Sequence, residues 1–217
     1  MKIGVPKEIK PQENRIGLTP DSVKILTSNG HDVLVENNGG FEAGFYNEQY
    51  KSAGAKIIDK AEDIFNDAEI IVKVKEPLSN EVKMIRENQI IFTYLHLAAA
   101  KELTEGLIKS KAVCIAYETI TDDDGKLPLL APMSAVAGRM SIQAGAHSLE
   151  KNQKGRGLLL GGAPGVDPAN VVILGGGVVG ENAALIATGM KAKVYIVDKS
   201  EKRLGQLKHM FGDKIIP

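Results

Sequence analysis

A glycine-rich turn in the second half of the sequence is the strongest sign of chemistry. Gly175-Gly176-Gly177-Val178-Val179-Gly180 follows the apolar run VVIL and precedes the small-residue run NAALIATG. Between a strand and a helix, Gly175 permits a tight turn, Gly177 lets the backbone approach a pyrophosphate, and Gly180 lets the helix pack closely. The amino terminus of that helix offers N–H donors to an anion. We therefore expect a dinucleotide site; the alternative is a glycine turn without a ligand.

Asp198 ends the next expected strand, where a carboxylate can accept hydrogen bonds from ribose hydroxyls. A carboxylate there repels the 2′-phosphate of NADP, so NAD is the expected cofactor. Lys199 and Arg203 lie just beyond Asp198 and could compensate for a phosphate, which leaves use of NADP as an alternative.

A second group of polar residues lies in the first half of the sequence. Arg15 follows the first expected strand, Lys75 follows the fourth, and Tyr94 and His96 follow the fifth. Ligands of open α/β sheets bind beyond the carboxyl ends of the strands, so these side chains could share one crevice. An arginine to bind a carboxylate, a cation near a carbonyl oxygen and an acid/base titrating near neutrality suit a small 2-oxo or 2-amino acid.

Each of these residues also has a structural interpretation. Arg15 lies in the polar stretch KPQENR and could be a surface charge, Lys75 could end a strand in solvent, and His96 within YLHLAA could be a structural histidine. The acidic run Asp122–Asp124 lacks the glutamate spacing of a calcium loop, so we expect a solvated turn and no metal.

Short β-branched runs alternate with helical segments over the first 116 residues, a pattern typical of parallel βα units. The expected strands are Lys2–Val5, Asp32–Glu36, Lys56–Ile58, Glu69–Val74, Gln89–Tyr94 and Ala112–Ala116. The expected helices are Pro20–Ser28, with Thr19 as N-cap, and approximately Asn47–Ala53, Ser79–Glu87 and Lys101–Lys109.

A second α/β pattern follows a long Ala-rich helix expected over Met133–Gln153. Its expected elements are the strands Val171–Leu174, Lys193–Val197 and Lys214–Ile216 and the helices Val178–Gly189 and Ser200–Met210. The predicted fold class is α/β, with two doubly wound Rossmann-like parallel-sheet units of which the second is incomplete. The expected domains are 1–130, which binds substrate, and 131–217, which binds the cofactor.

The composition excludes several classes of protein. The 217 residues include 27 Lys and Arg, 27 Asp and Glu, and 43% apolar residues, so a disordered chain or a nucleic-acid-binding protein is not expected. Pro164 and Pro168 interrupt the most apolar segment, Gly157–Gly180, and argue against a membrane helix. The single cysteine, Cys114, and an amino terminus without a signal-peptide core indicate the cytoplasm.

Several motifs together resemble the alanine dehydrogenase and nicotinamide nucleotide transhydrogenase family, and its alanine dehydrogenase branch in particular. They are Gly4-Val5-Pro6-Lys7-Glu8, the stretch from Glu13 to Pro20, YLHLAA, SAVAGRM and GGAPGV, and the resemblance covers the whole chain. It implies the reversible reaction of L-alanine, NAD and water to pyruvate, ammonia and NADH in L-alanine catabolism. It also implies a soluble homo-oligomer, often a hexamer.

The resemblance also assigns roles to residues. It implies that Arg15 and Lys75 bind the substrate, with Tyr94 beside them, and that His96 donates or accepts the proton. It further implies that NAD is contacted by Ser134, Val178, Val179, Asp198 and Arg203, which makes Arg203 an adenosine-side contact.

Three alternatives stay open: a transhydrogenase α-type subunit, a related opine-forming or saccharopine-type dehydrogenase, and a noncatalytic NAD-binding fragment. A complete dinucleotide fold has a second half that holds the nicotinamide ribose, and the sequence ends before such a half. We therefore expect this chain alone to be inactive or nearly so.

Overall fold

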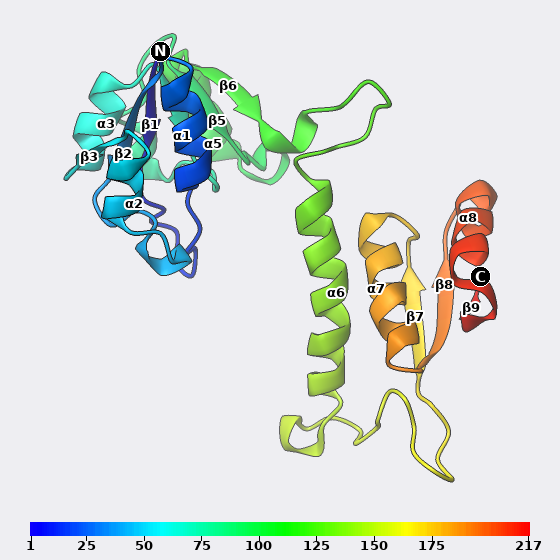
Figure 1. The fold of residues 1–217 in the computed structure, drawn as a ribbon. Helices are drawn as coiled ribbons and strands as arrows, with labels where there is room; N and C mark the ends of the chain where they lie inside the picture. The colour runs from blue at the N-terminus through cyan, green and yellow to red at the C-terminus, as the bar shows by residue number, and fades with distance from the viewer. The chain divides into compact units, whose positions relative to one another are not determined.

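The computed structural model describes all residues from Met1 to Pro217. The chain divides into two compact units, Met1–Thr121 and Asp122–Pro217. Figure 1 shows strands and helices in both units. No helix is both long and apolar enough to cross a membrane.

The first unit contains a parallel sheet of six strands in the order β3-β2-β1-β4-β5-β6. Consecutive strands therefore run outward from β1 in one direction and outward from β4 in the other, which is the doubly wound arrangement. This confirms the predicted α/β fold class. The strands are β1 (Lys2–Val5), β2 (Asp32–Glu36), β3 (Lys56–Ile58), β4 (Ile70–Val72), β5 (Ile90–Thr93) and β6 (Val113–Ala116).

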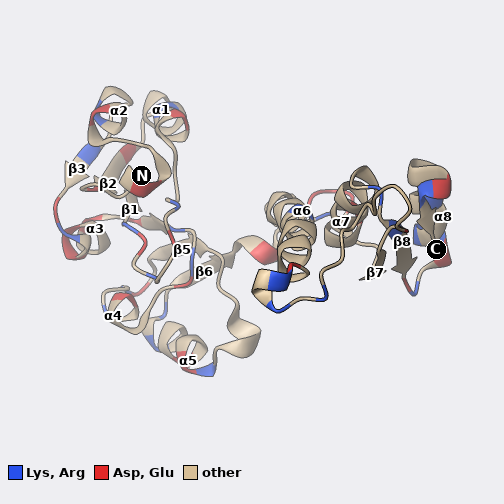
Figure 2. Ribbon diagram, turned by 90° about the horizontal axis from the view of Figure 1, so that it is seen from below, with Lys and Arg blue, Asp and Glu red and all other residues tan.

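Both faces of this sheet are covered by helices. Val33 and Val35 of β2 pack in the cluster that contains Val23 and Tyr50, while Leu34 packs in the cluster that contains Phe65. This alternation follows from the two-residue repeat of a strand. One face carries α1 (Pro20–Ser28) and α2 (Asn47–Ser52); the opposite face carries α3 (Ala61–Asp67), α4 (Ser79–Val82) and α5 (Lys101–Ser110) (Figure 2).

Most elements of the first unit have the predicted positions. Helix α1 begins after Thr19, whose hydroxyl oxygen accepts a hydrogen bond from the backbone N–H of Ser22 at 3.3 Å, and it ends at Ser28. Strands β1, β2 and β3 have the predicted bounds.

Helix α3, by contrast, was absent from the prediction. It has no side-chain N-cap hydrogen bond, and its apolar residues Ile64 and Phe65 are fully buried. It packs against β1 at Gly4, where a Cβ atom would lie 2.5 Å from Cγ2 of Ile64. Packing against the sheet, rather than a local signal, therefore stabilises this helix.

Helix α4 is shorter than predicted, because it ends at Val82 rather than Glu87. The chain then forms tight turns in which the N–H of Met84 donates to the carbonyl oxygen of Glu81 and the N–H of Ile85 donates to the carbonyl oxygen of Val82. Asn88 has a positive φ of 64°, which is incompatible with a continuing helix.

The second unit contains three parallel strands in the order β7-β8-β9. Helices connect its consecutive strands, so this sheet is a βαβαβ unit. Its core gathers small and aliphatic residues such as Ala184, Ile196 and Leu207. The elements are α6 (Ala131–Ser148), β7 (Asn170–Leu174), α7 (Val178–Gly189), β8 (Lys193–Val197), α8 (Glu201–Phe211) and β9 (Ile215–Ile216).

Helix α6 ends five residues before the predicted position, at Ser148 rather than Gln153, where a short 3-10 helix (Lys151–Gln153) follows. The N–H of Gly155 donates to Glu150 and the N–H of Gly157 donates to Leu149, so the chain folds back on the end of the helix. A Cβ atom at Gly155 would lie 2.3 Å from the carbonyl oxygen of Ser148, so this close approach requires glycine.

Substitution of Gly180 should destabilise the second unit. A Cβ atom there would lie 1.8 Å from the carbonyl oxygen of Gly175, whereas a Cβ atom at Gly189 in the same helix meets nothing within 4 Å. We expect Gly180→Ala to reduce the free energy of unfolding by about 1–3 kcal/mol, and Gly189→Ala to leave it unchanged or raise it by up to about 1 kcal/mol. Urea unfolding followed by amide NMR signals of the second unit measures both, and equal effects would contradict the steric explanation.

Candidate active site

The polar residues of the first unit gather at the carboxyl edge of its sheet, where the strand order reverses between β1 and β4. Arg15 lies in the loop between β1 and α1, Lys75 follows β4, and Tyr94 and His96 follow β5. The charge of Arg15 acts on the pKa of Tyr94, and the charge of Lys75 acts on the pKa of Glu13, so these loops lie near one another. The structure thus brings the predicted substrate residues to one edge.

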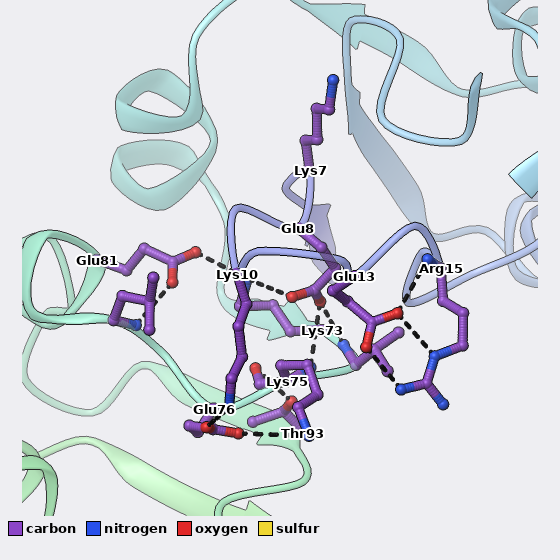
Figure 3. A network of polar contacts seen from close by, with 12 residues as sticks. Lys7, Glu8, Lys10, Glu13, Arg15, Lys73, Lys75, Glu76, Glu81 and Thr93 are labelled. Carbon is purple, nitrogen blue, oxygen red and sulfur yellow. Dashed lines mark hydrogen bonds and ion pairs between the residues drawn. The ribbon is translucent and has the colours of Figure 1, made fainter. Parts of the chain in front are cut away.

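A buried group of charges lies beneath this edge. The Nζ atom of Lys73 lies 3.2 Å from Oε2 of Glu8 and 2.8 Å from Oε1 of Glu81, and all three side chains are at most 3% exposed (Figure 3). A buried ammonium requires partners, since removing it from water costs several kcal/mol. The residues Lys73, Glu8 and Glu81 form what we call the buried triad.

The buried triad also shapes the loop that carries Lys75. Oε1 of Glu8 accepts hydrogen bonds from the N–H of Val74 at 2.6 Å and of Lys75 at 3.3 Å. Strand β4 ends at Val72 rather than at the predicted Val74, so these two N–H groups lie just beyond it. The hydroxyl of Thr93 donates to the carbonyl oxygen of Lys75 at 3.0 Å. Lys75 is therefore held from both sides of its backbone.

Arg15 is oriented by a neighbouring carboxylate. Its Nε and Nη2 atoms donate to the two carboxylate oxygens of Glu13, at 2.7 and 2.6 Å. The hydrogen bond from Arg15 lowers the pKa of Glu13, although burial acts in the opposite direction. The same hydrogen bond raises the pKa of Arg15, which stays a cation. Arg15 is half exposed, and its pairing with Glu13 fixes the plane of its guanidinium.

Glu76 lies between three cationic or hydrogen-bonding side chains. Its Oε1 atom pairs with Lys10, and its Oε2 atom lies 3.2 Å from Nδ1 of His96 and 3.9 Å from Nζ of Lys75. This carboxylate therefore joins the loop after β1 to the loops that carry Lys75 and His96.

The backbone at His96 adopts an unusual conformation. Its φ is 51°, in the left-handed region, which is rare for a residue with a side chain. The carboxylate of Glu118 accepts hydrogen bonds from the N–H of Leu95 at 3.1 Å and of His96 at 2.7 Å. The ring of Tyr94 stacks near that of His96, with centroids 6.1 Å apart. Strained backbone held in this way is common at functional sites.

Together these residues can bind a small acid. Arg15 carries a guanidinium, a group that binds carboxylates, Lys75 carries an ammonium that can donate to a carbonyl oxygen, and His96 carries a ring that can transfer a proton. Burial raises the pKa of Tyr94, which stays protonated and keeps a donor hydroxyl beside Arg15. No group of three or more histidine, cysteine or acidic side chains is arranged to hold a metal ion.

In the second unit, the glycine turn connects β7 to α7. Gly175 has a φ of 98°, and Gly177 precedes α7 without a side-chain cap. A Cβ atom at Gly177 would point into open space, while Gly180 contacts Gly175. Ser134 of α6 lines the same groove of about 710 Å³ as the residues of this turn, including Val178 and Val179. Close packing of α6 on α7 brings Ser134 there, since a Cβ atom at Gly138 would lie 2.2 Å from the carbonyl oxygen of Val179.

Asp198 and Arg203 also bind the turn itself. Oδ2 of Asp198 accepts a hydrogen bond from the N–H of Gly176 at 2.6 Å, and Oδ1 accepts one from Ser200 at 2.8 Å. These two bonds lower the pKa of Asp198, so the carboxylate is ionised near neutrality. Nε of Arg203 donates to the carbonyl oxygen of Gly176 at 2.6 Å, and its Nη2 pairs with Glu181.

Two family models match almost the whole chain. The model "Alanine dehydrogenase/PNT, N-terminal domain" matches residues 4–137, and the model "Alanine dehydrogenase/PNT, C-terminal domain" matches residues 141–217. The chain belongs to this family. The resemblance seen in the motifs is therefore confirmed.

Individual family members are also similar to the chain. An alanine dehydrogenase of Methanococcus maripaludis is 53% identical over 215 residues, which cover 99% of this chain and 58% of that protein. One of Halomonas elongata is 56% identical over 207 residues, which cover 95% of this chain and 56% of that protein. A solved structure of an L-alanine dehydrogenase has 52% identity and a TM-score of 0.91, covering 99% of this chain and 59% of that chain.

A more distant solved structure shares the fold. A transhydrogenase from Sinorhizobium meliloti has 24% identity and a TM-score of 0.82, covering 100% of this chain and 64% of that chain. The chain spans about 58% of the length of its alanine dehydrogenase relatives.

Several charged residues that form ion pairs in or beneath the candidate site were not predicted from the sequence. They are Glu8, Lys10, Glu13, Lys73, Glu76 and Glu81. A signal did exist for one of them. Lys73 stands between Val72 and Val74 in an apolar strand pattern, and a lysine in a buried strand requires a carboxylate partner from elsewhere in the fold.

Removal of the ammonium from the buried triad should destabilise the first unit. We expect Lys73→Met to reduce the free energy of unfolding by about 3–5 kcal/mol, because it leaves Glu8 and Glu81 buried without their cation. Lys111→Met removes an exposed pair with Glu87 and should cost less than about 1 kcal/mol. Urea unfolding followed by amide NMR signals of the first unit compares the two, and similar losses would contradict a special role for Lys73.

The ion pair of Glu13 and Arg15 should make the stability of the first unit depend on pH in the acid range. Because the folded-state pKa of Glu13 is lowered, the contribution of Glu13 to the free energy of unfolding is present above its unfolded-state pKa. This contribution is lost as the pH falls through the folded-state pKa. We expect Arg15→Gln to raise the pKa of Glu13, as measured by ¹³C NMR titration of its carboxyl group. Arg156→Gln serves as the control, and an unchanged pKa of Glu13 in Arg15→Gln would show that the pair does not set it.

Proposed function

We propose that the chain belongs to an NAD-dependent alanine dehydrogenase, which converts L-alanine, NAD and water to pyruvate, ammonia and NADH. In this proposal residues 1–130 bind the substrate and residues 131–217 bind NAD. The observation that carries the proposal is the meeting of Arg15, Lys75 and His96 at one sheet edge, in a chain about half identical to alanine dehydrogenases over 215 residues.

Arg15, Lys75 and Tyr94 would bind the substrate. The guanidinium of Arg15 pairs with the carboxylate of pyruvate or alanine, and its orientation by Glu13 reduces the entropy lost on binding. The ammonium of Lys75 donates to the carbonyl oxygen of pyruvate, which polarises the carbonyl carbon. Tyr94, coupled electrostatically to Arg15, lines the carboxylate side.

His96 would transfer the proton. Loss of a hydride from Cα of alanine, together with a proton from its nitrogen, leaves an iminium. Water then adds to the iminium carbon while His96 accepts a proton from it, and the resulting carbinolamine releases ammonia to give pyruvate. In the reverse direction the same group returns the proton.

The residues of the second unit fit NAD. The open space at Gly177 lets a pyrophosphate approach the backbone, and the uncapped amino terminus of α7 offers it N–H donors. Asp198 is ionised and would accept hydrogen bonds from ribose hydroxyls, and Ser134, Val178, Val179 and Arg203 lie around the turn. When bound, NAD supplies the hydride acceptor.

Arg203 bears on the choice between NAD and NADP. Its Nη2 atom pairs with Glu181 and its Nε atom donates to the backbone of Gly176, so its charge is already neutralised within the turn. This supports NAD as the cofactor. A cytoplasmic location and a homo-oligomeric assembly are parts of the same proposal, and they are supported by the family resemblance.

Ligand titrations of the purified chain test this proposal. We expect pyruvate to shift amide NMR signals around Arg15, Lys75 and His96, and NAD to shift those of Gly175–Gly180 and Asp198. Arg15→Ala should weaken pyruvate binding at least about tenfold, because it removes a charge-assisted bidentate contact, while NAD binding stays unchanged.

Arg156→Ala removes an exposed arginine of the second unit and is the matched control for net charge. Pyruvate affinity that is unchanged in Arg15→Ala contradicts the substrate site. Binding of NAD without pyruvate favours the noncatalytic alternative.

A further inference from the structure

We infer that Glu76 is a positioning residue that keeps the ring proton of His96 on Nδ1 and so leaves Nε2 as the atom that exchanges a proton with the substrate. This inference rests on the proposed role of His96 and adds a residue to it. The juxtaposition that carries it is the carboxylate of Glu76 at 3.2 Å from Nδ1.

The surroundings of Glu76 favour an ionised carboxylate. Its side chain is 17% exposed, Lys10 pairs with Oε1, and Lys75 lies 3.9 Å from Oε2. Burial raises the pKa of Glu76, but the hydrogen bond and charge of Lys10, with the charge of Lys75, outweigh burial and lower it overall. An ionised carboxylate can only accept hydrogen bonds. A hydrogen bond between these two groups therefore requires the proton to be on Nδ1.

The other groups around His96 leave this role to Glu76. The nearby carboxylate of Glu118 accepts from the backbone N–H groups of Leu95 and His96, so it fixes the backbone rather than the ring. Tyr94 stacks on the ring with an interplanar angle of 26°. Backbone, ring plane and Nδ1 are thus each held by a different residue.

The position of Glu76 is itself restricted. Pro77 follows it, and a residue before proline is confined to extended backbone conformations. Because the same oxygen, Oε2, faces Nδ1 of His96 and Nζ of Lys75, it also limits how far these two groups can separate. In the proposed reaction, Glu76 thereby aligns the proton acceptor with the group that binds the carbonyl oxygen.

Long-range ¹H–¹⁵N NMR of the imidazole nitrogens of the full chain tests the inference without any substrate. At about pH 9, above the ordinary histidine range, each neutral ring carries one proton, and the ¹⁵N shifts identify its nitrogen. We expect His96 to be in the Nδ1–H form, and we expect Glu76→Gln to shift it toward the Nε2–H form. Loss of signals in His96→Gln assigns them.

Two controls separate this role from general effects of charge. Glu118→Gln removes a carboxylate that accepts from the backbone N–H groups of Leu95 and His96 and makes no hydrogen bond to the ring, so the Nδ1–H form should persist. His147 lies 3.3 Å from Glu150, but both side chains are more than half exposed, so its ring should show no such preference. An Nε2–H form of His96 in the unchanged chain overturns the inference, as does an equal shift in Glu76→Gln and Glu118→Gln.

Failure of the inference and failure of the proposed function give different results. If the chain binds pyruvate but His96 is in the Nε2–H form, only the role of Glu76 is wrong. If His96 is in the Nδ1–H form but pyruvate does not bind, the positioning contact stands and the proposed substrate site is wrong.

Discussion

The ammonium of Lys73 lies inside the first unit, and the rest of the site depends on how it is neutralised. Its two carboxylate partners come from distant segments: Glu8 from the loop after β1 and Glu81 from α4. Each carboxylate also accepts from backbone N–H groups, Glu8 from Val74 and Lys75 and Glu81 from Leu78. One buried charge therefore draws three segments together. No buried side-chain nitrogen or oxygen in the structure lacks a hydrogen-bond partner, so this network is complete.

The exposed part of the site lies above this buried layer and is also ordered by paired charges. Glu13 orients Arg15, Glu76 faces Lys75 and His96, and Glu118 holds the backbone of His96. Arg15, Lys75 and His96 are thus each supported by a carboxylate. Such support holds functional groups in place before the ligand arrives, which is what precise binding and proton transfer require. In the second unit, a carboxylate of the same kind, Asp198, stabilises the glycine turn through Gly176.

Local sequence signals predicted much of the fold. They failed for elements whose formation depends on packing against distant parts of the chain. The start of α1 followed from Thr19, because a capping residue acts on its immediate neighbours. Helix α3 has no such cap and forms because Ile64 and Phe65 are buried against the sheet. The buried ammonium of Lys73 pairs with Glu8, a residue far away in the sequence. No pattern within the strand could have indicated this partner.

The sequence by itself determined the family, the α/β class and the glycine turn, because each has a local motif, and it pointed to Arg15, Lys75 and His96 as candidates through their positions at strand ends. Only the tertiary structure decided which carboxylates support them. Nothing in the sequence distinguishes Glu8, Glu13, Glu76 and Glu81 from the other acidic residues as partners of these side chains. Their roles arise from contacts between loops that the parallel sheet brings to one edge, and the charge of a side chain acts through distance in space rather than along the chain.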